Sequence, residues 1–228
     1  MLAKPKKISR KKVKEDKLVT YYSKTLEFYE KNQTKIIIAV GALAVIILAM
    51  VLWSNKMEQS NLEATKQLAR VLPIYESGNY QEAIDGRAGT NIVGLKSIVE
   101  EYGSTAQGEI AKIYLANANY YLDNIDEAQK YYSDYSGGDA LFKAAALAGE
   151  ASCYSAKGNY DKAAEYYKRA AKVSENNAAN AEYLLKAGIN FIEAGKSDDA
   201  KDVLEKIKSD YAASSFVTNA NRYLALIK

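Results

Sequence analysis

The chain has 228 residues, of which 26% are charged, and its 31 Lys and Arg nearly balance its 28 Asp and Glu. It contains no histidine and a single cysteine, Cys153. These counts remove the commonest general base, the usual metal ligand, every Ser–His or Cys–His nucleophile pair and any internal disulfide. We therefore expect no enzyme, no catalytic or metal-binding residue and no cofactor, and Cys153 is expected to be a small buried residue of a helix.

Positive charge is concentrated at the N-terminus. Eleven basic and four acidic residues precede Ile36, a balance of +7, whereas twenty basic and twenty-four acidic residues from Ile36 onward give −4. Residues 1–17 are predicted to be a basic tail that sets membrane topology and attracts anionic lipid, or that contacts RNA on a nearby ribosome. We favour topology and lipid, and expect no nucleic-acid partner. The residues concerned are Lys4, Lys6, Lys7, Arg10, Lys11, Lys12, Lys14 and Lys17.

Residues 18–34 are predicted to form a short amphipathic helix next to the membrane. Leu18, Tyr22, Leu26 and Tyr29 recur at helical spacing and are flanked by charged residues. Such a helix can lie in the membrane interface or dock on the cytoplasmic face of a partner. The sequence leaves both alternatives open.

An uncharged run of 18 residues, from Ile36 to Trp53, predicts a membrane-spanning helix over residues 35–55. At about 1.5 Å per residue the run reaches roughly 27 Å, close to the thickness of a bilayer's hydrocarbon core. Trp53 would anchor it at the interface, and Gly41 has no glycine four residues later to form a dimerisation pair. We interpret the run as an uncleaved signal anchor rather than a cleaved signal peptide, because no convincing cleavage site follows it. The basic tail then predicts an N-in, C-out orientation.

Residues 56–228 are predicted to form an all-helical repeat domain. The pattern Gly158-x-Tyr160-x-x-Ala163 recurs around Gly195 and Ala200 and more weakly around Ala128, at spacings of 35 and 37 residues. A period of about 34 residues is typical of tetratricopeptide repeats. The fold class is therefore all-α, a single N-terminal transmembrane helix followed by a tetratricopeptide-like α-solenoid.

Small residues in this pattern let paired helices cross closely, aromatic residues fill the gap to the next unit, and glycine takes the turn. A loop insertion is expected from Gly86 to Gly94, a kink at Pro73, and a closing helix from Phe216 to Lys228. Met57 to Leu72 is expected to continue the membrane helix into the domain. The residues predicted to pack the repeats are Ala128, Ala151, Tyr154, Gly158, Tyr160, Ala163, Tyr167, Gly188, Gly195 and Ala200.

The first helix of each repeat lines the concave surface of such a superhelix, and polar and aromatic residues there suit an extended peptide or a partner's helix. The candidates are Asn117, Tyr120, Tyr121, Ser152 and Ser155, with simple packing between helices as the alternative. A clamp for peptide C-termini would need basic residues where Ile113, Ala148 and Leu185 stand, so we reject it. Ala194–Ser197 resembles the end of a phosphate-binding loop, but Asn190 replaces the required glycine and the context is helix-turn-helix.

The run KLVTYYSKTLEFYEKNQ, the apolar anchor and the segments IVEEYGST, GNYDKAAEYYKRA and YLLKAG together resemble the YfgM-like family of ancillary SecYEG translocon subunits. Frequent Lys, Tyr and Asn suggest a Bacteroidetes-type bacterium. The resemblance implies an inner-membrane adaptor whose periplasmic domain recruits chaperones or emerging exported chains. The alternatives are a scaffold for envelope or outer-membrane assembly or cell division, and an accessory subunit of an envelope enzyme.

Overall fold

The computed structural model describes residues 10–227, with side chains from residue 17 onward, and divides the chain into two compact units, Met1–Lys56 and Met57–Lys228. One helix, α1 (Arg10–Glu76), contributes to both units. The predicted tail residues Lys4, Lys6 and Lys7 lie outside the described residues, as do the side chains of Arg10, Lys11, Lys12 and Lys14. The backbone of the tail is helical from Arg10 onward, and Lys17 is exposed on α1.

Helix α1 has no break at residue 34 or residue 55. The juxtamembrane stretch, the apolar run and the first helix of the repeat domain are therefore consecutive parts of one helix rather than separate elements. Pro73 lies inside its last turn, and the Ser77 amide donates to the Pro73 carbonyl at 3.1 Å. Proline has no amide N–H, so residue 73 cannot donate to the Ala69 carbonyl, and α1 continues for only three residues beyond it.

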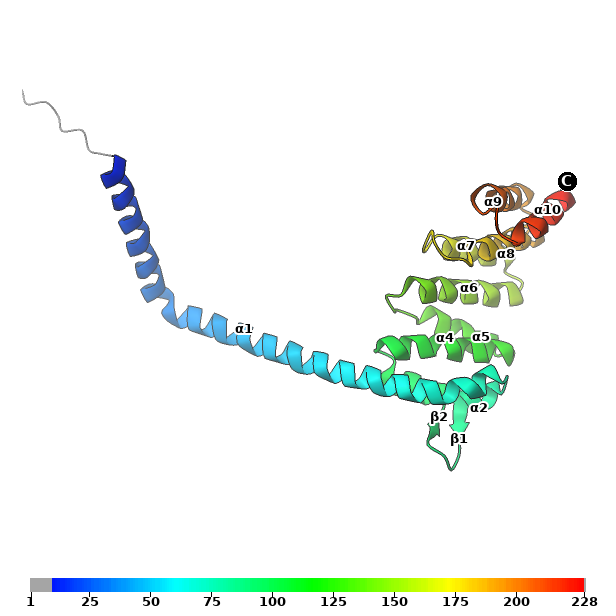
Figure 1. Ribbon diagram of the computed structural model, residues 1–228, viewed down its shortest axis with the longest axis horizontal. Helices are drawn as coiled ribbons and strands as arrows, with labels where there is room; N and C mark the ends of the chain where they lie inside the picture. Colours follow the sequence, from blue (N-terminus) through cyan, green and yellow to red (C-terminus); the bar gives the residue numbers. More distant parts are fainter. Residues whose placement is uncertain (1–9, 228) are drawn as a thin grey trace, which may run out of the picture. The chain divides into compact units, whose positions relative to one another are not determined.

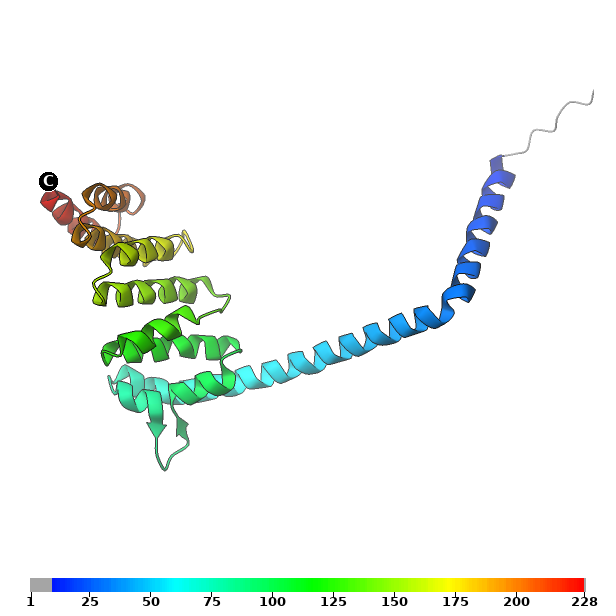
Figure 2. The same ribbon diagram turned by 180° about the vertical axis from the view of Figure 1, so that it is seen from behind.

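Beyond α1 the chain is a succession of short helices and one small hairpin: α2 (Tyr80–Asp85), β1 (Gly86–Arg87), β2 (Ile92–Val93), α3 (Leu95–Tyr102), α4 (Ala106–Tyr121), α5 (Ile125–Ser133), α6 (Ala140–Ala156), α7 (Tyr160–Ala171), α8 (Asn180–Glu193), α9 (Ser197–Asp210) and α10 (Phe216–Leu226). From α4 onward the helices are stacked in chain order up to α10 (Figures 1 and 2), and each packs against the helix that follows it in the sequence. The all-α solenoid prediction is confirmed, and α10 packs on α8 and α9 at the end of the stack.

The loop insertion at Gly86 folds as an antiparallel ribbon in which Gly86 pairs with Val93 and Arg87 with Ile92. Gly86 has φ +83°, and a Cβ added at Gly94 would lie 2.1 Å from the carbonyl oxygen of Ile84. Both positions therefore need glycine, one for its backbone conformation and one for close approach. The insertion is thus a small hairpin, where the sequence predicted only a loop.

The crossing points of the helix pairs are fully buried small residues. Ala116 on α4 and Ala151 on α6 occupy equivalent places, with Gly188 on α8 next in the series. A Cβ at Gly188 would lie 2.7 Å from Leu204 side-chain atoms, so the α8–α9 crossing is closer than alanine allows. On the second helices Ala128, Ala163 and Ala200 are also fully buried. Cys153 is buried beside them, and burial raises the pKa of its thiol to about 11.

The turns within the pairs share one backbone conformation. Gly78, Gly158 and Gly195 have φ between +72° and +79°, and Asp123 takes the same place with φ +64°. In the second full pair the amides of Gly158 and Asn159 donate to the carbonyls of Ser155 and Tyr154, which closes the end of α6. A left-handed residue after a helix satisfies its last carbonyls in this way.

Candidate protein-binding groove

A cavity of about 420 Å³ lies along the face formed by α4, α6 and α8, with one residue each from α5 and α7. Three small residues of α6 line its middle, and five tyrosines and one lysine surround them. We call this cavity the tyrosine groove, and its lining residues are Asn117, Tyr120, Tyr121, Tyr132, Ala145, Ala148, Gly149, Ser152, Tyr167, Tyr183 and Lys186.

Two hydrogen-bonded pairs, repeated at a 35-residue spacing, join neighbouring helices at the groove. The Tyr132 hydroxyl of α5 donates to Oδ1 of Asn117 on α4. One repeat later the hydroxyl oxygens of Tyr167 and Ser152 are 2.7 Å apart. Since the Ser152 hydroxyl donates to the Ala148 carbonyl at 3.0 Å, Tyr167 is the donor in that pair. Both tyrosine protons are therefore used inside the protein.

A chain of tyrosine rings begins at Tyr114 and ends at the groove. Tyr75 on α1 makes edge contacts with Tyr114 and Tyr80, at centroid distances of 5.1 and 5.4 Å. Tyr80 is stacked on Tyr121 at 4.7 Å with 15° between the ring planes. Tyr121 is nevertheless 62% exposed, so one face of its ring is open to a ligand.

Lys186 is the one charged side chain in the groove lining. Its Nζ lies 2.8 Å from a carboxylate oxygen of Glu182, one helical turn earlier on α8, and 5.9 Å from the centre of the Tyr167 ring. Burial lowers the pKa of Lys186, but the hydrogen bond to Glu182 and the facing tyrosines outweigh it and raise the pKa above its ordinary value. Lys186 is therefore cationic across the physiological pH range.

Burial raises the pKa of four groove tyrosines above the ordinary value, so these phenols stay neutral over the same range; they are Tyr120, Tyr132, Tyr167 and Tyr183. Burial also raises the pKa of Tyr75, which packs against Tyr114 and Tyr80, to about 12. The groove thus offers neutral phenol groups around a single positive charge.

Four of the five predicted partner-binding residues meet in the groove: Asn117, Tyr120, Tyr121 and Ser152. Ser155 is half-buried on α6 and does not line it. Tyr132, Tyr167, Tyr183 and Lys186 are additional lining residues. The expectation that basic residues are missing from this face is wrong at Lys186, which follows buried Leu185 directly in the sequence.

Three other candidate sites lie in the described part of the chain or were suggested by its sequence. A second cavity of about 270 Å³ between α7, α8 and α9 mixes Lys168, Lys172 and Lys206 with Asp199 and Asp202. No group of three or more Cys, Asp or Glu within the described residues could hold a metal ion. Gly195, in the stretch that resembles a phosphate loop, forms the turn between α8 and α9.

Two family models described as tetratricopeptide repeat match the chain, at residues 144–177 and 182–214. These segments coincide with the pairs α6–α7 and α8–α9. The chain contains tetratricopeptide repeats. No curated protein of similar sequence is found. Domains of this type are typically non-catalytic scaffolds, so the repeats indicate a role in protein–protein interaction.

Proposed function

We propose that the protein is a membrane-anchored adaptor that binds protein partners in the tyrosine groove. The observation that carries this proposal is the groove itself, which belongs to a tetratricopeptide domain and is lined by aromatic and polar side chains from consecutive repeats, with the Tyr121 ring exposed. Tyrosine suits protein recognition because it offers a large apolar surface and a hydroxyl with few rotatable bonds.

Membrane anchoring is supported by the apolar stretch of α1. It is long and apolar enough to cross a membrane, and every large apolar side chain from Ile37 to Trp53 is at least half exposed. Leaving each such side chain in water rather than in an apolar medium costs about 1.5–3 kcal/mol. Ile36, Gly41 and Trp53 accordingly belong to a lipid-facing surface, and a Cβ added at Gly41 would touch nothing.

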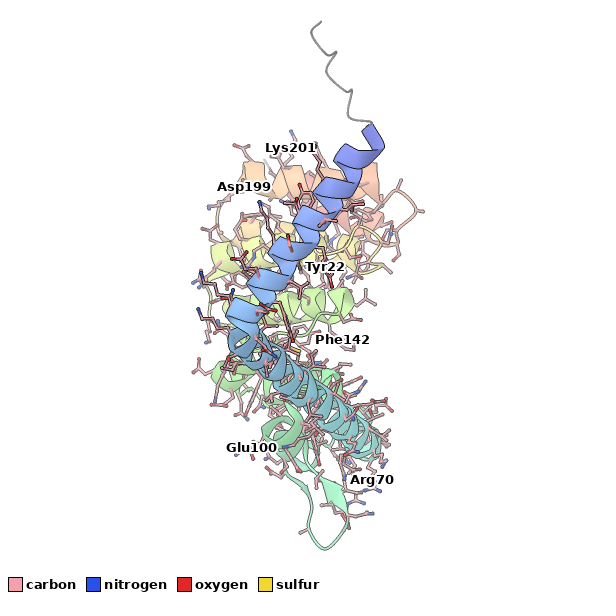
Figure 3. The ribbon with its side chains drawn as sticks, turned by 90° about the vertical axis from the view of Figure 1, so that its left-hand side faces the viewer. Tyr22, Arg70, Glu100, Phe142, Asp199 and Lys201 are labelled. Atoms are coloured by element: carbon pink, nitrogen blue, oxygen red, sulfur yellow. The ribbon has the colours of Figure 1, made fainter. Side chains whose placement is uncertain are left out.

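The proposed topology is single-pass, with residues 1–17 and 18–34 in the cytoplasm, 35–55 in the inner membrane and 56–228 in the periplasm. The excess of positive charge before Ile36 supports this orientation. Side chains stand out along α1 in its juxtamembrane part, Tyr22 among them (Figure 3), and Leu18, Tyr22 and Phe28 are each more than half exposed. This stretch would meet lipid headgroups or the cytoplasmic face of a partner.

The partners we propose are the Sec translocon and, on the periplasmic side, chaperones or exported chains. The support is the resemblance of the anchor and repeat segments to ancillary translocon subunits, together with a groove on the proposed periplasmic side. A scaffold for envelope assembly or cell division would use the same groove with other partners.

The test is a cross-linked purification of the tagged full-length protein from mild detergent, with partners identified by mass spectrometry. The double variant Tyr120→Ala/Tyr121→Ala alters the groove, and Leu141→Ala, at an exposed site at the start of α6, is the matched control. We expect translocon components and periplasmic proteins with wild type and control, and loss of the periplasmic proteins with the double variant. Recovery of envelope-assembly or cell-division proteins without the translocon channel would refute the translocon role and favour the scaffold alternative. Equal capture of periplasmic proteins by wild type, control and double variant would refute groove binding.

A further inference from the structure

We propose that the tyrosine groove recognises an acidic segment of its partner, with Lys186 and the Tyr120 hydroxyl holding an Asp or Glu side-chain carboxylate. This inference rests on the proposed function, since it names the chemistry of the partner that the groove binds. It follows from which donors in the groove are already used and which are free.

Most polar groups of the groove are committed to the protein's own structure. The Tyr132 proton is donated to Asn117, the Tyr167 proton to Ser152, and the Ser152 proton to the Ala148 carbonyl. These three hydroxyl groups fix the walls of the groove and have no proton left to donate to a ligand.

Lys186 and Tyr120 both line the groove and keep hydrogen atoms for a ligand. Lys186 has three N–H bonds and gives one to Glu182, on a side chain that is 44% exposed. No hydrogen bond within residues 17–227 uses the Tyr120 hydroxyl. The charge of Lys186 acts on Tyr120, where it opposes the larger effect of burial on the pKa of that phenol. A cation and a free phenol O–H that line the same groove can both donate to the acceptor oxygens of a carboxylate.

The surrounding charges favour the same ligand. Glu182 is not part of the lining, and it occupies only one N–H of Lys186, so two N–H bonds of this lining residue remain for a ligand. A basic segment would meet Lys186 without a compensating acid in the lining. A purely apolar segment would bury the remaining N–H bonds of Lys186 and the Tyr120 hydroxyl without partners, which is unfavourable. An extended acidic segment satisfies both donors, while the small side chains of Ala145 and Ala148 leave room for its backbone.

The test compares three fluorescein-labelled peptides that differ only at their charged positions. Each alternates glycine and serine, is acetylated and amidated so that no terminal carboxylate is present, and carries three Glu, three Gln or three Lys. Anisotropy titrations use the full-length protein in detergent at low ionic strength. The variant is Lys186→Gln, and the matched control is Lys201→Gln, at an exposed lysine of α9 (Figure 3).

We expect wild type and Lys201→Gln to bind the Glu peptide about tenfold more tightly than the Gln peptide, as one charge-assisted hydrogen bond predicts. Lys186→Gln should abolish that preference, Tyr120→Phe should reduce it, and Lys186→Glu should transfer it to the Lys peptide. Equal affinity of wild type for the Glu and Gln peptides, or a preference that survives Lys186→Gln, would overturn the inference. The proposed function would still stand in that case if Tyr120→Ala/Tyr121→Ala abolished partner capture, so the two failures are distinguishable.

Discussion

The substitution Gly149→Ala tests the packing that forms the tyrosine groove. A Cβ at residue 149 would lie 2.3 Å from Cε1 and Cζ of the Tyr132 ring and 2.5 Å from its Cδ1. That ring cannot move aside freely, because Tyr132 is only 5% exposed and its hydroxyl is held by Asn117. Alanine must therefore displace the ring, separate α5 from α6, or break the hydrogen bond to Asn117.

The expected cost combines two effects. Overpacking by one methyl group in a close-packed site costs about 1–3 kcal/mol, and losing the Tyr132–Asn117 hydrogen bond adds about 1 kcal/mol. Gly149→Ala should therefore destabilise the repeat domain by about 2–4 kcal/mol. For a domain of about this size, 1 kcal/mol corresponds to a change of roughly 2–4 °C in Tm. The variant should melt about 5–15 °C below wild type.

The assay is thermal unfolding of the full-length protein in detergent, followed by near-ultraviolet circular dichroism of the tyrosines. Gly138→Ala is the control, because a Cβ there meets nothing within 4 Å and its φ is outside the left-handed region. The double variant Gly149→Ala/Tyr132→Leu should recover part of the loss, since the clash disappears with the ring. A Gly149→Ala protein that melts with wild type, or a double variant showing purely additive losses, would refute this account of the contact.

Three further predictions concern other parts of the repeat domain. Burial alone would raise the pKa of Glu109, but hydrogen bonds from Lys112 and Ser136 outweigh it and lower that pKa. The stabilisation by ionised Glu109 is therefore present above about pH 4.5 and is lost as pH falls further. Lys112→Met should destabilise the protein by about 3 kcal/mol at pH 7 and by much less at pH 3. Burial raises the pKa of Glu150, so Glu150→Gln should raise Tm at pH 7, with no gain below pH 4. Asp123→Gly should stabilise by about 1 kcal/mol, whereas Gly158→Ala should destabilise by a similar amount, as urea titrations would show.

The repeat period predicted most of the fold because each position of the repeat requires a particular residue type for one physical reason. A residue that must be small at a helix crossing recurs wherever the crossing recurs, so Ala151 and Gly188 could be aligned without a structure. The hairpin at Gly86 could not be predicted in this way. Its strands have two residues each, which is too short for an alternating pattern to be visible. The continuity of the membrane helix with residues 57–72 was predicted, but its continuity with the juxtamembrane stretch at residue 34 was not. A change of composition at residue 35 does not require a change of backbone conformation.

The groove was only partly predictable, for a geometric reason. Asn117, Tyr120, Tyr121 and Ser152 lie on first helices, where the repeat pattern itself indicates a concave face. Tyr132 and Tyr167 lie on second helices, and their place in the pattern suggested core filling. Their rings are indeed buried, but their hydroxyls form hydrogen bonds with the groove residues Asn117 and Ser152. A buried aromatic residue can thus form a wall of a binding surface, and sequence spacing does not distinguish that role from packing.

The repeat pattern also distinguishes the positions that fix the helix backbones around the groove from a position whose side chain differs between repeats. Tyr114, Gly149 and Lys186 occupy one equivalent position on α4, α6 and α8, two residues before Ala116, Ala151 and Gly188. At this position Tyr114 packs against Tyr75, Gly149 leaves the space that the Tyr132 ring fills, and Lys186 supplies the charge. The crossing residue two positions later stays small in all three helices, so the backbones remain in register while this side chain varies. Selectivity in this groove should therefore follow position 186, where exchanging the residue should alter ligand preference with less effect on the fold than a change at Gly149 or at a crossing residue.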